Sequence, residues 1–152
     1  MACLGLEYDK LDIFLIDYEI FKANPNWWLE ITNIFLKPGI KFKLILEKED
    51  NNILEKFFKY YNDFEINTEK YLINVEGIIN DEMIRDFKES YKVKNSDGID
   101  YYSPFISLEI GENYCSAHNG SELYLTNISE DDLEKNYKII NPLDKYLKVY
   151  IS

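Results

Sequence analysis

Cys115 and His118 are the two residues whose types and spacing come closest to a catalytic pair. A cysteine nucleophile needs an imidazole within hydrogen-bond reach to accept its proton. On an extended strand, however, a spacing of three residues directs the two side chains to opposite faces. The same divergence opposes a metal site made of Cys115, His118 and Glu112, and no second metal-ligand motif supports one. We therefore expect a buried cysteine beside a turn histidine, with no catalytic residue and no metal site.

Other catalytic and cofactor motifs are absent from the sequence. It contains no G-x-G-x-x-G or G-K-[ST] phosphate loop, no D-x-D-x-D-G calcium loop and no G-x-S-x-G nucleophile motif. Because the chain has a single histidine, a Ser-His-Asp hydrolase is not expected. Carboxylates are so abundant that no pair of them points to a glycosidase. We expect neither an enzyme nor a bound cofactor.

Charge is concentrated in one quarter of the chain. The acidic segment, Asn95–Glu134, contains nine carboxylates and no lysine or arginine, within a chain whose net charge is −11. The residues before it sum to −5 and those after it to +3. A phosphate-binding surface needs Lys and Arg, so this charge argues against DNA, RNA and anionic membranes as ligands. It favours a basic protein as the partner.

Tyrosines are interleaved with the carboxylates of the acidic segment. Rings supply buried area and cation–π contacts, and carboxylates pair with Lys and Arg, so the combination is typical of surfaces that bind basic proteins. A simpler explanation for Glu130, Asp131 and Asp132 is that acids in a helix's first turn complement its dipole. The complete absence of bases goes beyond what capping requires. The predicted partner-binding residues are Asp97, Asp100, Tyr101, Tyr102, Glu109, Glu112, Glu122, Tyr124, Glu130 and Asp131.

The composition predicts one domain that spans residues 1–152, because this length and a 46% hydrophobic content suffice for a full core. The two cysteines are too few for a disulfide framework. The N-terminal residues lack the basic start of a signal peptide, and the apolar run at 13–16 is too short for its core or for a membrane span. We therefore expect a cytoplasmic protein in a reducing compartment.

Hydrophobic periodicity predicts the elements of the N-terminal half. Residues 27–36 fit both a helix and a strand, and their composition favours a strand. Pro38-Gly39, which follows, suits a type II turn. The other predicted strands are 11–20, 40–49 and 71–75, and two helices are expected to begin after Asn52 and Asn80.

Asn119-Gly120 is the best hairpin turn in the sequence, because this dipeptide favours a type I′ turn. In that turn His118 pairs with Ser121, which would put His118 on the same inward face as Leu123. The opposite, outward face of the hairpin would carry Asn113, Cys115, Ala117, Glu122, Tyr124 and Thr126.

The remaining elements complete an α+β pattern. They are a strand at 101–110, with Phe105 and Leu108 on opposite faces, a helix capped by Ser129, and a C-terminal strand at 145–152. Hairpin-like neighbours with a few helices between them predict a largely antiparallel sheet with about three helices, rather than a doubly wound fold.

The whole chain resembles a known class of proteins in its overall character. Small size, acidity, many tyrosines and the segments DGIDYYSPF, ENYCSAHNGSELY and SEDDLE resemble the immunity proteins that bacteria pair with secreted or contact-delivered toxins. The resemblance implies a stoichiometric inhibitor of a cognate toxin domain, often a basic nuclease. Carboxylates would stand in for substrate phosphates, and association would be steered by charge and sensitive to salt.

Two other classes of function stay open at this point. A small enzyme or ligand-binding module would have an aromatic-lined pocket containing His118 or a carboxylate of raised pKa. A structural subunit of a larger assembly would instead show a broad apolar patch.

Overall fold

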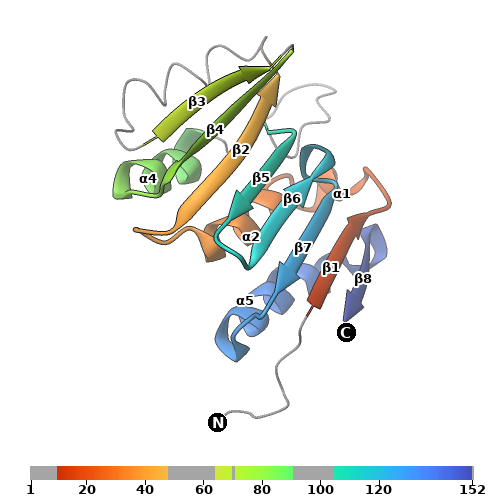
Figure 1. Ribbon diagram of the computed structural model, residues 1–152. Coiled ribbons are helices and arrows are strands. Elements are labelled where there is room, and N and C mark those ends of the chain that lie inside the picture. Colours follow the sequence, from red (N-terminus) through yellow and green to blue (C-terminus); the bar gives the residue numbers. More distant parts are fainter. Residues whose placement is uncertain (1–9, 48–63, 70, 91–104, 152) are drawn as a thin grey trace.

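The computed structural model describes residues 10–47, 64–69, 71–90 and 105–151. Eight strands form one sheet in the order β3-β4-β2-β5-β6-β7-β1-β8, and all neighbouring strands are antiparallel (Figure 1). The predicted α+β class with an antiparallel sheet is therefore confirmed. The strands are β1 (Lys10–Leu15), β2 (Lys41–Glu47), β3 (Phe64–Glu69), β4 (Leu72–Ile78), β5 (Ser107–Ile110), β6 (Tyr114–Ala117), β7 (Glu122–Thr126) and β8 (Leu147–Ile151).

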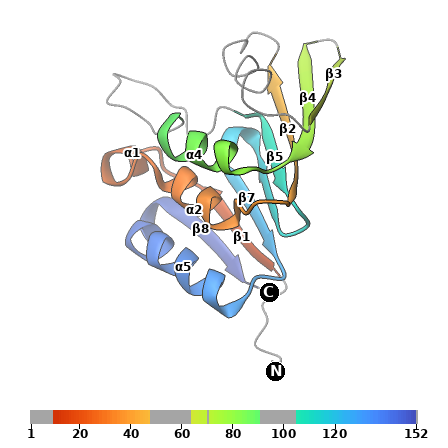
Figure 2. The ribbon, with the colours of Figure 1, turned by 90° about the vertical axis from the view of Figure 1, so that its left-hand side faces the viewer.

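The helices of the described ranges gather on one side of the sheet (Figure 2). They are more numerous than the three or so predicted, and the helix expected after Asn52 lies outside the described residues. The α-helices are α1 (Ile20–Ala23), α2 (Trp27–Phe35), α4 (Asp81–Ser90) and α5 (Glu130–Ile140); the short segments η1 (His118–Gly120) and η2 (Asn141–Tyr146) complete the set.

The first two strands of the chain lie in two different regions of the sheet, and later strands pair between them. β1 pairs with β7 and β8, whereas β2 pairs with β4 and β5, so the first two strands lie far apart in the sheet. The connection between them, through α1 and α2, runs along the helix side. The meander β5-β6-β7 closes the gap between the two regions. This topology places the described helices α1, α2, α4 and α5 on one side of the sheet.

Helix α2 corrects the prediction that residues 27–36 form a strand. Most of its side chains are buried, among them Trp27, Trp28, Leu29, Ile31 and Phe35. The helix lies against the sheet and contacts both α4 and α5. Only Glu30 is exposed and Asn33 is half-buried, so the polar stripe of α2 is narrow and gives a weak signal of amphipathic helical periodicity.

Buried hydrogen bonds fix α2 to β6. The Trp28 indole donates to the Ser116 hydroxyl, with 2.9 Å between Nε1 and Oγ. The Thr32 hydroxyl lies 2.7 Å from the Trp28 carbonyl oxygen and 2.6 Å from the Tyr114 hydroxyl. Burial raises the pKa of Tyr114, which therefore keeps its proton. These bonds satisfy polar groups that would otherwise be costly in the core.

The predicted hairpin is confirmed in register and in turn type. Ser116 faces Leu123 across the strands. Asn119 and Gly120 have φ of 57° and 87°, and the Ser121 N–H donates to the His118 carbonyl at 3.2 Å, as a type I′ turn requires. Leu123 is fully buried, so the inward face of the hairpin is also as predicted.

Turns and caps elsewhere follow the sequence. Gly39 has φ of 86° and the Ile40 N–H approaches the Lys37 carbonyl, which fits the expected type II turn. Asn80 Oδ1 accepts from the Met83 N–H at 2.9 Å, and Ser129 Oγ accepts from the Asp132 N–H at 3.1 Å. Both predicted helix caps are therefore confirmed.

Three predicted strand assignments were wrong in detail. The strand predicted at 11–20 ends at Leu15, and the apolar residues after it lead into α1. The hairpin of β3 and β4 replaces the single short strand expected at 71–75. Phe105 precedes β5, so the inward and outward alternation of side chains along that strand does not apply to it. It is fully buried and stacks on Phe87, with 5.6 Å between ring centroids.

Candidate functional site

The open face, defined as the sheet surface on the side away from the described helices, carries the outward side chains of all eight strands. Buried residues such as Leu44 and Leu108 point toward the helices, and their neighbours in sequence, such as Lys43 and Glu109, point away. Figure 1 looks onto this side of the sheet, with α2 and α5 behind the strands. An antiparallel sheet can be solvated on one face, and the described helices leave this one open.

One row of side chains crosses the open face over all eight strands. The register places its members directly opposite one another. The single lysine in the row, Lys43, has its Nζ 3.8 Å from Oε1 of Glu76. The remaining charged members are all carboxylates, so the row is acidic. From β3 to β8 it consists of Glu65, Glu76, Lys43, Glu109, Cys115, Tyr124, Asp12 and Tyr150.

Three aromatic rings form a cluster at the β7-β1-β8 end of this row. The Phe14 ring contacts Tyr124 and Tyr150 edge to face, with centroid distances of 5.8 and 5.7 Å. Tyr150 is 49% exposed. Aromatic rings that are partly exposed yet held by one another are preorganised for contact with a partner.

Asp12 lies between the two tyrosines of the cluster. The register sets it opposite Tyr124 on one side and opposite Tyr150 on the other. Its carboxylate makes no ion pair or side-chain hydrogen bond with any described residue. A half-buried carboxylate between two rings, without a cation of its own, is an acceptor for a cation from outside.

Glu122 adds a second carboxylate beside the cluster. The Tyr124 hydroxyl donates to Glu122 Oε2 at 2.5 Å, and His118 Nε2 lies 3.6 Å from the same oxygen. The hydrogen bond to Glu122 is the main cause that raises the pKa of Tyr124 to about 12, and the charge of Asp12 contributes. The raised pKa keeps the Tyr124 hydroxyl protonated as the donor of its hydrogen bond to Glu122.

Six of the ten predicted partner-binding residues lie in the described ranges, and they fall into two groups. Glu109, Glu122 and Tyr124 lie on the open face. A second group lies at the end of the sheet, in the β5–β6 turn and in the first turn of α5: Glu112, Glu130 and Asp131. The other four, Asp97, Asp100, Tyr101 and Tyr102, lie outside the described residues.

The sequence reasoning missed Asp12, Phe14, Glu76 and Tyr150, which the structure brings onto the open face. All four lie outside the acidic segment, so local charge density does not indicate them. The signal that could have found them is strand alternation. Asp12 and Phe14 alternate with buried Leu11 and Ile13 in β1, but the neighbour of β1 in the sheet could not be deduced from its sequence.

Cys115 and His118 do not form a catalytic pair in the structure. Burial, with a contribution from the charge of Glu109, raises the pKa of the Cys115 thiol, which disfavours the reactive thiolate. No hydrogen bond joins the two side chains. The prediction that His118 shares the inward face of Leu123 was wrong. His118 has φ of 51°, which turns its side chain toward Glu122.

Comparison with protein-family models, curated proteins and solved structures found no match. Within the described ranges, no helix combines the length and the apolar character needed to cross a membrane. In the same ranges, no group of three His, Cys, Asp or Glu side chains is placed to hold a metal ion.

Proposed function

We propose that this chain is a small acidic binding protein that neutralises a basic protein partner through its open face. The observation that carries the proposal is the position of Asp12, a carboxylate without a cation partner among the described residues, between Tyr124 and Tyr150. The acidic row extends the same charge preference across the sheet. The net charge of −11 favours a basic partner over an acidic one.

An arginine or lysine of the partner fits the surroundings of Asp12. The planar guanidinium stacks on tyrosine rings while its N–H groups pair with a carboxylate. The chain's own Lys148 illustrates the first contact, since its Nζ lies 5.6 Å from the centroid of the Tyr150 ring. Rings and a desolvated carboxylate at the centre of an interface are the kind of residues that dominate binding energy.

The most specific form of the proposal is an immunity protein of the cytoplasm that inhibits a nuclease-type toxin. Such a toxin needs cationic residues to hold the phosphates of its substrate. Carboxylates that bind the same cations block the substrate path, and opposite net charges speed the encounter of the two proteins. The acidic row and Glu122 supply carboxylates at several positions for this purpose.

A growth assay tests this function. The protein encoded by the gene adjacent to that of this chain is expressed in a bacterial host, alone and together with the chain. We expect growth arrest by the neighbour alone, rescue by the wild-type chain, and loss of rescue by Asp12→Lys at unchanged protein abundance. A neighbour that leaves growth unaffected, or a rescue that does not depend on the chain, would contradict the immunity function.

A further inference from the structure

A cleft of about 220 Å³ opens at the end of the sheet, where α2 ends and α5 begins. The buried side chains Phe35, Ile110 and Ile128 give it apolar walls, and Ile40 forms part of its rim. This size and lining suit a single side chain with an apolar stem. The cleft is separate from the aromatic cluster of the open face, because none of the cluster's residues lines it.

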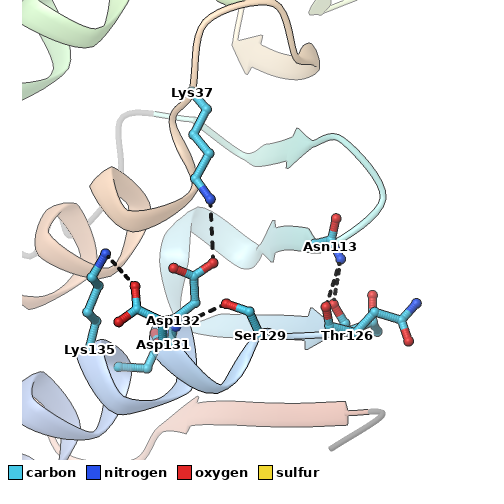
Figure 3. A network of polar contacts seen from close by, with 9 residues as sticks. Lys37, Asn113, Thr126, Ser129, Asp131, Asp132 and Lys135 are labelled. Carbon is cyan, nitrogen blue, oxygen red and sulfur yellow. Dashed lines mark hydrogen bonds and ion pairs between the residues drawn. The ribbon is translucent and has the colours of Figure 1, made fainter. Parts of the chain in front are cut away.

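Asp132 is the charged group of the cleft, and it is poorly satisfied. Its side chain is only 14% exposed, yet among the described residues its one cationic partner is Lys37, whose Nζ lies 3.5 Å from Oδ2 (Figure 3). A good charge-assisted hydrogen bond spans about 2.7–2.9 Å, so this pair is loose. A mostly buried carboxylate gains free energy from a closer and better-directed donor.

Asn113 supplies a second acceptor. Its Nδ2 donates to the carbonyl oxygens of Thr126 and Asn127, at 2.8 and 3.2 Å, which fixes the orientation of the amide. Its Oδ1 consequently points away from β7, as Figure 3 shows. Asn127 and Ser129 also line the cleft, and their amide and hydroxyl groups can accept as well as donate. Together with Asp132 and Asn113 they let the cleft bind a hydrogen-bond donor.

We propose that this cleft is a socket for one arginine or lysine side chain of the partner, whose cation binds Asp132 while its stem packs on the apolar walls. The inference rests on the proposed function in taking the partner to be a basic protein. Lys37 holds the place of that side chain in the free protein. Lys37 is 58% exposed and its ion pair is loose, so its displacement costs little.

Small probes test the socket without any protein partner. The wild-type chain is titrated with n-butylguanidinium chloride and with n-butylammonium chloride, while amide chemical shifts are followed by NMR. Uncharged n-butanol has the same stem and serves as the control. We expect saturable shifts at the amides of Gly111, Asn113 and Ile128 with the cations only. The stronger of the two cations then tells whether the socket prefers arginine or lysine.

Matched variants connect the binding to Asp132. Asp132→Asn keeps the backbone N–H that Ser129 caps. It should raise the dissociation constant of the cation about tenfold, because a hydrogen bond to a charged group is lost. Asp131→Asn removes the same charge one residue away, from a side chain that is 75% exposed and paired with Lys135, and should leave affinity unchanged. Lys37→Met removes the competing cation and should tighten binding severalfold.

Three outcomes would overturn the socket: no saturable shift in the wild type, equal shifts with n-butanol, or equal weakening by Asp132→Asn and Asp131→Asn. The wild-type titration decides the matter even if a variant fails to fold. Because the titration involves no partner protein, a negative result would reject the socket proposal alone. The open-face proposal keeps its own test in the growth assay, which depends on Asp12.

Discussion

The indole Nε1 of Trp28 donates a hydrogen bond to Oγ of Ser116 across 2.9 Å, and both side chains are buried. The bond joins helix α2 to β6, a central strand of the sheet. It therefore fixes which side of β6 packs against α2. The other side, which carries Cys115 and its neighbours in the acidic row, is left uncovered by α2 as a consequence.

Replacement of Ser116 by alanine should destabilise the fold. The Trp28 N–H would stay buried without an acceptor, so we expect a loss of about 1–3 kcal/mol in the free energy of unfolding. Urea denaturation followed by tryptophan fluorescence measures it. Ser121→Ala is the matched control, because the Ser121 hydroxyl bonds to the His118 carbonyl at the exposed turn. Equal losses in the two variants would show that the buried bond has no special importance.

The Tyr124 hydroxyl should titrate abnormally. Its pKa is raised to about 12, chiefly by the hydrogen bond to Glu122, and Glu122→Gln should lower the pKa toward its ordinary value of 10. The ¹³Cζ shift of labelled Tyr124 against pH measures this, and Glu112→Gln, which removes a carboxylate at the end of the sheet, should change nothing. A Tyr124 pKa near 10 in the wild type would contradict the geometry.

The same pKa shift predicts how stability changes at alkaline pH. The folded chain keeps the Tyr124 proton that the unfolded chain releases near pH 10. The contribution of protonated Tyr124 to the free energy of unfolding is therefore fully present below pH 10. It is lost as the pH rises from 10 toward 12. Unfolding free energies across this range should therefore fall less steeply in Glu122→Gln than in the wild type. Parallel slopes would remove the link between Tyr124 and stability.

Cys115 should behave as an unreactive thiol. Burial and the charge of Glu109 raise its pKa, so in a Cys3→Ser background iodoacetamide should alkylate it more slowly at neutral pH than an unfolded peptide containing the same residue. Cys115→Ala should cost at most about 1 kcal/mol of stability and leave growth rescue intact. Alkylation faster than in the peptide, or loss of rescue with unchanged stability, would revive a catalytic interpretation.

Much of the fold could be predicted because local patterns decide it. The alternation in β2, the Asn119-Gly120 turn and the Ser129 cap each depend on a few neighbouring residues, and each appears in the structure. Helix α2 was not predicted, because burial of most of its side chains leaves a polar stripe of only Glu30 and Asn33 in its sequence. Whether these residues form a helix depends on their packing against the sheet, and local sequence does not encode that packing.

The candidate site was predictable only in part, because a surface is assembled by topology. The acidic segment led to Glu109, Glu122 and Tyr124, which share the open face. Strand order then separates Glu130 from them and brings in Asp12, more than a hundred residues away in sequence from Tyr124. The insertion of β1 between β7 and β8 decides this arrangement, and it follows from long-range pairing rather than from local propensity.

The most direct test of the open face is the affinity for the protein encoded by the adjacent gene, measured by isothermal titration calorimetry for two charge reversals. Asp12→Lys reverses a carboxylate between two tyrosine rings on the open face, whereas Glu134→Lys reverses a carboxylate of the acidic segment on α5. The proposal predicts that Asp12→Lys weakens binding about thirtyfold or more, because the loss of a charge pair at an interface costs about 2 kcal/mol of binding free energy. It predicts that Glu134→Lys changes the affinity little. Equal effects, or a larger effect of Glu134→Lys, would contradict the open face as the binding surface.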